Sequence, residues 1–113
     1  MVKLISMFKR KPGLSPEEFH RYWREVHGPL VASTKSGRHA LRYEQNHRPL
    51  DDYARRGTMD YDGVTEQWFD TLDDFYASLR EEDFPLVDED MNKFIDPTSL
   101  VWIMTEDAEV IFE

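Results

Sequence analysis

The stretch that decides the fold runs from Ser15 to Val31 and reads SPEEFHRYWREVHGPLV. It opens with the signature of a helix N-terminus: Ser15 can cap the first free amides, Pro16 suits the first helical position, and Glu18 completes a capping box. Apolar residues then recur at spacings of three and four, which places them on one helix face; they are Phe19, Tyr22, Trp23, Val26 and Leu30. The pattern predicts an amphipathic helix that packs on a sheet, with a kink or restart near His27 where Gly28-Pro29 interrupts it.

The segments around this helix complete the order strand, helix, strand, strand, helix, strand. Strands are predicted at residues 2–9, 40–48, 64–70 and 100–105, and a second amphipathic helical region follows Thr71 and ends at Asp96-Pro97. Residues 49–60 predict a connecting loop with room for one helical turn. This order is typical of an α+β, ferredoxin-like split βαβ fold, in which a four-stranded antiparallel sheet carries both helices on one face. We expect one domain over residues 1–113.

The predicted arrangement leaves the second face of the sheet bare. Several strands have apolar residues on both sides, and a further apolar group, Val110, Ile111 and Phe112, follows the last strand and is expected to find a partner surface. Burial of the bare face against a second copy of the chain is the simplest solution, because twofold dimers are the commonest oligomers. We therefore predict a homodimer.

Charge and composition exclude several classes of function. The chain has 113 residues and a formal net charge of −9, which repels nucleic acids and anionic membrane surfaces. It contains no cysteine, so disulfides, thiolate nucleophiles and Cys-bound zinc are excluded, and we expect a cytoplasmic protein. The longest strictly apolar run, residues 100–104, is too short for a membrane helix. We expect no metal site, because no histidine pair has zinc-site spacing and the acidic run 88–90 is typical of a solvated helix face.

Two histidines are the candidates for proton transfer. His27 lies at the edge of the apolar helix face, where imidazole could act as a general acid or base. The alternative is a histidine that caps the interrupted helix by bonding a free carbonyl. His47 shares one face of the predicted second strand with Tyr43 and Gln45. These three side chains converge on one hollow if that face meets the helices, and are ordinary surface residues if it meets solvent.

The two faces of the predicted third strand hold different residues: Asp62, Glu66 and Trp68 on one, and Thr65, Gln67 and Phe69 on the other. Alternation alone does not decide which face meets a pocket. Glu66 could orient a buried histidine, or form a cross-strand salt bridge with Arg42. Trp23 and Trp68 could wall a site for an apolar or aromatic ligand, although tryptophan is more often a core residue.

Taken in order, several motifs of the chain resemble those of the EthD family. They are KRKPGLS at 9–15 with Glu18-Phe19, Tyr22-Trp23, HGPLV at 27–31, Tyr43 with QNH at 45–47, Asp62-Gly63, Glu66 and Trp68-Phe69. The resemblance implies a dimeric α+β barrel and a pocket between helices and sheet that needs no cofactor. It further implies that His27 is the acid or base of that pocket, that Tyr43 and His47 match a second-strand motif, and that Glu66 and Trp68 match a third-strand motif.

What the resemblance implies about chemistry is broad. The family is described as oxidoreductase, and similar fungal members act as decarboxylases or dehydratases on polyketides. Methylmuconolactone methylisomerases, which look like distant relatives, carry a reactive cysteine where this chain has Gln67. An amide can orient a ligand but cannot attack it, which puts isomerase chemistry of that kind in doubt here.

We therefore expect a cofactor-independent enzyme of small-molecule catabolism or secondary metabolism. It would act on a small apolar or aromatic oxygenated ligand by histidine acid–base chemistry and be classed as an oxidoreductase. The expected catalytic residues are His27 and His47, and the expected substrate-binding residues are Trp23, Tyr43, Glu66, Gln67 and Trp68. The alternatives are a polyketide-type lyase, cyclase or isomerase, or a non-catalytic dimer that binds a hydrophobic ligand.

Overall fold

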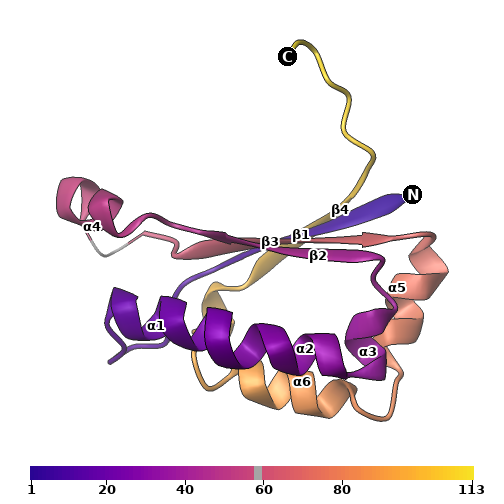
Figure 1. The fold of residues 1–113 in the computed structure, drawn as a ribbon, viewed down its shortest axis with the longest axis horizontal. Coiled ribbons are helices and arrows are strands. Elements are labelled where there is room, and N and C mark those ends of the chain that lie inside the picture. The colour runs from indigo at the N-terminus through magenta and orange to yellow at the C-terminus, as the bar shows by residue number, and fades with distance from the viewer. Residues whose placement is uncertain (58–59) are drawn as a thin grey trace.

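The computed structural model describes residues 1–57 and 60–113 and consists of an antiparallel sheet with most of its helices on one face (Figure 1). The strands are β1 (Val2–Phe8), β2 (Arg42–His47), β3 (Gly63–Phe69) and β4 (Val101–Glu106). The helices are α1 (Pro16–Tyr22), the π-helical η1 (Trp23–His27), α2 (Gly28–Ser33), α3 (Lys35–Arg38), α4 (Leu50–Arg56), α5 (Leu72–Leu79), α6 (Phe84–Met91) and the 3-10 turn η2 (Pro97–Ser99). The strand order is β2-β3-β1-β4 with antiparallel pairing throughout. The predicted ferredoxin-like α+β fold is confirmed.

The interruption predicted near His27 is a widened helical turn rather than a break. Pro29 has no backbone N–H to donate to the carbonyl of Glu25 four residues earlier. In the structure the N–H of Gly28 bonds the carbonyl of Trp23, five residues earlier, and the chain then continues as α2. A single extra residue in the turn thus carries the helix past its proline, as π-turns do.

Two short helices differ from the sequence prediction. α3 forms where no element was predicted, and it begins at Thr34, whose side-chain oxygen accepts a hydrogen bond from the N–H of Gly37. α4 occupies much of the predicted loop and is longer than one turn. It buries Tyr53, while its other side chains remain largely in solvent, so it lacks the apolar stripe that would have revealed it. Part of that predicted loop, residues 58–59, lies outside the described residues.

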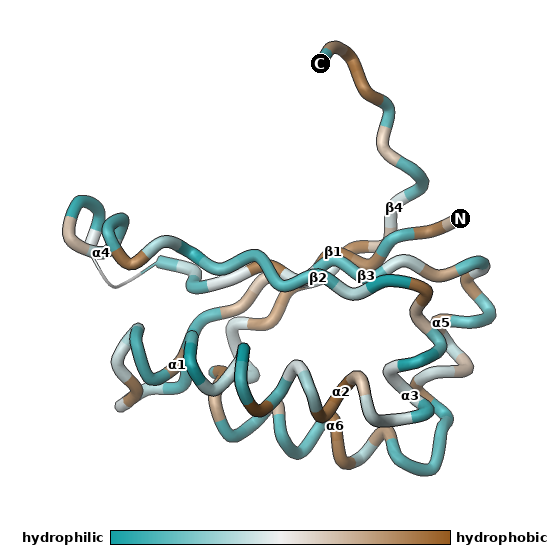
Figure 2. The backbone as a smooth tube through the Cα atoms, in the orientation of Figure 1, coloured by the Kyte–Doolittle hydropathy of each residue, from teal (hydrophilic) through white to brown (hydrophobic). Residues whose placement is uncertain are grey.

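The core lies between the sheet and the helices and has two apolar clusters. The first consists of Phe8, Phe19, Trp23, Phe94 and Ile95, and the second of Leu4, Phe69 and Phe75. In the first cluster, the ring of Phe8 meets that of Trp23 edge to face with centroids 5.2 Å apart. Figure 2 shows β2 as mainly hydrophilic, whereas β1 has several hydrophobic positions. Because successive strand residues point to opposite faces, each strand contributes every second residue to this layer.

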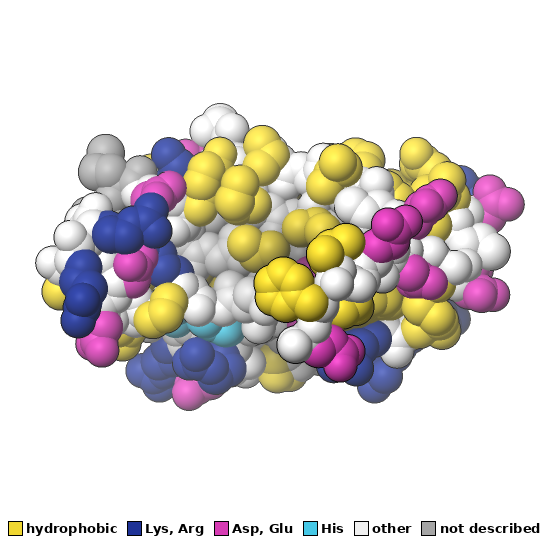
Figure 3. Space-filling view, turned by 90° about the horizontal axis from the view of Figure 1, so that it is seen from above, with side chains coloured by type: hydrophobic (Ala, Val, Ile, Leu, Met, Phe, Trp, Pro, Cys, Tyr) yellow, Lys and Arg dark blue, Asp and Glu magenta, His cyan; other side chains and the backbone are white. Residues whose placement is uncertain are grey.

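The face of the sheet opposite the helices is uncovered in the part of the chain that the structure describes (Figures 1 and 3). Alternation and register place six apolar residues on it: Ile5, Met7, Val64, Trp68, Val101 and Ile103. The tail after β4 leaves the sheet on this same side (Figure 1), and its Ile111 and Phe112 are 83% and 87% exposed. No described helix is long and apolar enough to cross a membrane.

Gly63 at the start of β3 tests how tightly the first cluster is packed. A Cβ added there would lie 2.4 Å from the Trp23 ring, so Gly63→Ala should lower the free energy of unfolding by about 1–3 kcal/mol, the usual cost of overpacking. Urea unfolding measures this loss. In a Trp23→Phe background the smaller ring leaves room for the methyl group, so the two costs should be less than additive. Additive costs would contradict the predicted clash.

Candidate functional site

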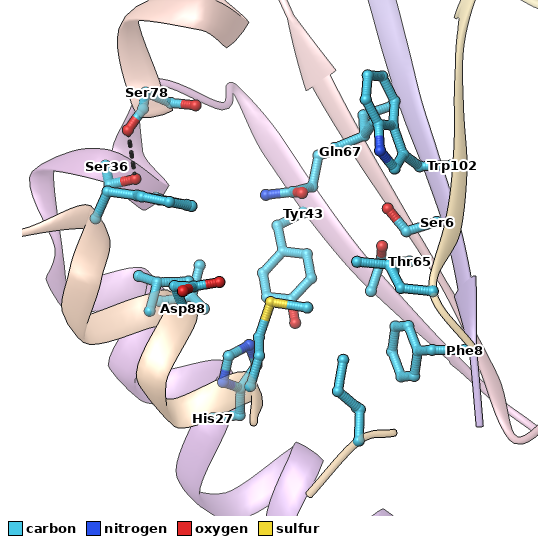
Figure 4. A pocket seen from close by; sticks show the side chains of 18 of the residues that line it. Ser6, Phe8, His27, Ser36, Tyr43, Thr65, Gln67, Ser78, Asp88 and Trp102 are labelled. Carbon is cyan, nitrogen blue, oxygen red and sulfur yellow. Dashed lines mark hydrogen bonds between the residues drawn. The ribbon is translucent and has the colours of Figure 1, made fainter. Parts of the chain in front are cut away.

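A cavity of about 320 Å³ lies between the sheet and the helices, and Figure 4 shows side chains from both layers around it. Its walls are mainly apolar and include members of both core clusters, together with Val31 of α2 and Trp102 of β4. Polar side chains reach it from both layers: Ser6, Tyr43, Thr65 and Gln67 from the sheet, and His27, Ser36, Ser78, Asp88 and Asn92 from the helical layer. A concave, mainly apolar space with a few convergent polar groups is the usual form of a small-molecule site.

His27 is held in the cavity wall by a carboxylate. Its side chain is 5% exposed, and its Nδ1 lies 2.8 Å from Oδ2 of Asp90 in α6. An ionised carboxylate only accepts hydrogen bonds, so Nδ1 carries the proton and Nε2 is the nitrogen with a free lone pair. His27 therefore does not cap a helix end, because the π-turn continues into α2 and no broken end is left to cap.

Asp90 is in turn held by Tyr22, whose hydroxyl donates to Oδ1 at 2.5 Å. Burial and the bond to Asp90 raise the pKa of Tyr22 to about 12, so the phenol keeps its proton at neutral pH. Burial lowers the pKa of His27 below its usual value, and the bond and charge of Asp90 offset only part of that effect. The ring is neutral at pH 7, the state that a general base requires.

Tyr43 and Gln67 face each other across β2 and β3 and both point into the cavity (Figure 4). Burial raises the pKa of Tyr43, so its phenol also stays protonated. The amide of Gln67 makes no hydrogen bond within the described residues, and it can donate to or accept from a ligand. Trp23, which is fully buried, contributes apolar wall.

His47 lies close to this cavity but does not line it. Its ring packs on that of Trp23 with centroids 4.2 Å apart, and it faces a second, more open hollow beside α4. Both ring nitrogens have side-chain partners: Nδ1 lies 2.7 Å from Nδ1 of His20, and Nε2 lies 2.8 Å from Oε1 of Gln45. His47 can reach a ligand in the cavity only through other residues.

The structure places Glu66 and Trp68 on the uncovered face of the sheet, away from the cavity. Glu66 pairs with Lys3 at 3.2 Å, and the Trp68 ring lies near the cations of Lys3 and Arg42. The sequence also allowed a salt bridge between Glu66 and Arg42. This salt bridge does not form, because Arg42 lies opposite Trp68 in the strand register and pairs with Glu44. The face of β3 that meets the cavity is the one with Thr65, Gln67 and Phe69.

Sequence reasoning missed Asp90, which we expected in a solvated acidic run. In the structure Asp90 is 5% exposed. One signal could have revealed it: Asp90 lies three residues after Val87 and four before Phe94, which places it on the apolar face of the helical region. His20, also buried, was missed as well. No group of three or more acidic or histidine side chains among the described residues could hold a metal ion.

The sequence model of the EthD domain matches residues 11–98. The chain belongs to the EthD family. An EthD family protein of Bacillus halodurans superposes with a TM-score of 0.69 at 17% identity, over 96% of this chain and 99% of that one. A dimeric protein with a ferredoxin-like fold from Bacteroides fragilis gives 0.65 at 15% identity, over 94% and 95%.

SnoaB of Streptomyces nogalater, described as a cofactor-independent oxygenase, gives a TM-score of 0.64 at 12% identity, over 99% of this chain and 97% of that one. At these identities the structural likenesses establish the fold alone. No curated protein sequence matches the chain.

The buried histidines His20 and His27 and the half-buried His47 should make the stability of this EthD protein fall in acid. Burial lowers the pKa values of His20, His27 and His47, that of His47 to about 4. As the pH falls below about 6.5, the unfolded chain therefore binds protons before the folded chain does, and the free energy of unfolding falls. Urea unfolding between about pH 7 and pH 4 measures this. His47→Gln should flatten the profile, and an unchanged profile would contradict the assignment.

Proposed function

We propose that this EthD protein is a cofactor-independent enzyme that moves a proton on a small apolar or aromatic oxygenated compound. The observation that carries the proposal is the neutral imidazole of His27 in the wall of an apolar cavity, with Nδ1 bonded to a buried carboxylate. That arrangement fixes the tautomer and leaves Nε2 as the base. The bond to Asp90 also stabilises the imidazolium that forms when the base takes a proton.

The other polar groups of the cavity suit a substrate with an oxygen. When His27 removes a proton from a hydroxyl or from carbon beside a carbonyl, negative charge develops on that oxygen. Tyr43 and Gln67 project into the same cavity and can donate hydrogen bonds to it. The apolar walls exclude water, which strengthens these bonds. Proton transfer of this kind is the first step shared by several reactions.

Oxidation is the reaction class that we propose first, and dioxygen would be its oxidant. The resemblance to the EthD family implies an oxidoreductase, and the neighbour SnoaB is described as a cofactor-independent oxygenase. The enolate or phenolate formed by His27 is electron-rich, the property such an oxidation needs. Decarboxylation or dehydration of a polyketide-type compound begins with the same proton step and is the alternative, in either catabolism or secondary metabolism. The lack of cysteine is in keeping with a cytoplasmic location.

We also propose that two copies pair through the uncovered face of the sheet. Val101 and Ile103 on that face are 46% and 60% exposed, and Figure 3 shows hydrophobic side chains gathered over it. A contiguous exposed apolar patch on a small protein is typical of an interface. The Bacteroides neighbour is described as dimeric, and a twofold pair would cover both faces at once.

The catalytic role of His27 is tested with His27→Asn. Purified protein is incubated with a panel of hydroxylated aromatic ketones and polyphenols, and consumption is followed by liquid chromatography and mass spectrometry. For any compound that the wild type converts, we expect the variant to lose at least about a hundredfold in turnover, since an amide cannot take the proton. Ligand affinity should change little, because the side chain remains polar and of similar size.

The matched control is His39→Asn. His39 also pairs with a carboxylate, at 3.0 Å from Glu81, but does not line the cavity, so this variant should retain wild-type turnover. Full turnover in His27→Asn would refute the catalytic assignment. A wild-type protein that binds panel compounds in the cavity and converts none would instead be a carrier.

The proposed dimer is tested with Ile103→Lys, which places a charge in the centre of the apolar face. Sedimentation or light scattering should show a dimer for the wild type and a monomer for the variant, because burying an unpaired ammonium is unfavourable. Leu86→Lys is the control: Leu86 is 54% exposed but lies on α6 in the helical layer. If Ile103→Lys is still a dimer, this face is not the interface.

A further inference from the structure

Gln45 lies behind the cavity wall on β2, and both ends of its side-chain amide are bonded. Nε2 donates to the carbonyl of Trp23 at 2.9 Å and to the hydroxyl oxygen of Tyr43 at 3.0 Å. Oε1 lies 2.8 Å from Nε2 of His47. Every hydrogen-bonding partner of this amide is therefore a group of the protein, and one of them, Tyr43, faces the cavity.

The Trp23 carbonyl fixes which way the amide points. A backbone carbonyl can only accept, so the nitrogen of Gln45 must face it. This carbonyl lies at the start of the π-turn, where it also accepts from the N–H of Gly28. A Cβ at residue 28 would lie 2.9 Å from Nε2 of Gln45. The amide reaches the carbonyl because the residue at that point of the turn is glycine.

The other end of the amide meets the ring of His47. Oε1 can only accept, so Nε2 of His47 carries the proton that the bond requires. Nδ1 of His47 meets Nδ1 of His20, and Nε2 of His20 lies 3.0 Å from the hydroxyl of Tyr53. Tyr53 in turn bonds the fully buried Asp62. The Tyr53 proton goes to Asp62 and Nδ1 of His47 has no proton in this tautomer, so the single N–H of neutral His20 can serve only one of its two partners. The orientation of Gln45 therefore rests on the Trp23 carbonyl.

The orientation of the Gln45 amide determines which hydrogen bonds the Tyr43 hydroxyl can form. Its oxygen accepts from Gln45, and the buried indole N–H of Trp23, which has no hydrogen-bond partner among the described residues, acts on the same hydroxyl by lowering its pKa. The hydroxyl proton itself has no acceptor among the described residues. Burial raises the pKa of Tyr43 more than these donors lower it, so the proton is present at neutral pH and available to a ligand.

We propose that Gln45, oriented by the Trp23 carbonyl, holds Tyr43 as a hydrogen-bond donor to the ligand. The cavity then selects compounds that present an acceptor oxygen, such as a ketone or a phenolate, to Tyr43. Gln45 and His47 are positioning residues. Gln45 bonds Tyr43 and His47 bonds Gln45, and neither of them touches the ligand. The inference rests on the ligand-binding cavity of the proposed function, but not on turnover.

A matched pair of probes tests the predicted selectivity. In 2-acetylnaphthalene a C=O group stands where 2-isopropenylnaphthalene has C=CH2, so the two have nearly the same shape and only the ketone can accept a hydrogen bond. Calorimetry on the wild-type protein should show about three- to tenfold tighter binding of the ketone, the range for one neutral hydrogen bond. Tyr43→Phe should abolish this preference and leave binding of the alkene in place.

Gln45→Glu tests the positioning role. An ionised carboxylate accepts the Tyr43 proton instead of donating to the oxygen, so the ketone preference should disappear although Tyr43 is still present. Asn46→Asp is the control: it makes the same amide-to-carboxylate change at the next residue of β2, which is exposed, and it should keep the preference. Retention of the full preference in Gln45→Glu would overturn the proposal.

A ligand-free measurement keeps the proposal testable if Gln45→Glu does not fold. Nitrogen-15 NMR of the wild-type protein should show His47 protonated at Nε2, as the bond to Oε1 of Gln45 requires. A ring protonated at Nδ1 alone would mean that Gln45 is reversed, and would overturn the inference while leaving the role of His27 intact. Failure of both probes to bind the wild-type protein would count against the ligand-binding cavity itself, and so against both proposals.

Discussion

The widened turn at Trp23–His27 is the constraint on which the rest of the site depends. Gly28-Pro29 forces it, because the helix has to pass a residue that cannot donate a backbone hydrogen bond. The turn sets His27 against α6, where Asp90 meets it, and turns the Trp23 carbonyl toward Gln45. It also presses the Trp23 ring onto Gly63. One local irregularity of the backbone thus serves both the proposed base and the proposed donor.

The polar groups of the site are stable in an apolar wall because they are bonded to one another. An unpaired buried carboxylate or imidazole costs several kcal/mol or changes its protonation state. Asp90 accepts from Tyr22 and His27, and Asp62 accepts from Tyr53 and from the backbone and side chain of Arg10. Within the described residues, the Gln67 amide and the Tyr43 hydroxyl proton have no protein partner, and both side chains line the cavity. Polar groups that are bonded within the protein therefore stabilise the fold, whereas polar groups without a protein partner are free to bind a ligand.

The sequence predicted the fold because the patterns that define it are local. Apolar spacing after Ser15 and alternation in the strands each describe one element, and the order of elements then restricts the topology. The site depends on contacts that no local pattern contains. Tyr43 and His47 share a strand face, yet they are separated by a rise of about 13 Å, so only Tyr43 reaches the cavity. For β3, alternation predicts which residues share a face, but it does not predict which of the two faces the helices cover.

The same alternation separates the two proposed roles of the sheet. On β1, Ser6 lines the cavity while its neighbours Ile5 and Met7 face the opposite side. A change on the outer face therefore reaches the cavity only through the backbone, which the hydrogen bonds of both neighbouring strands hold in place. Pairing of two copies and selection of a ligand can accordingly vary independently in this fold. This independence is consistent with a family whose fold is shared at identities as low as 17%.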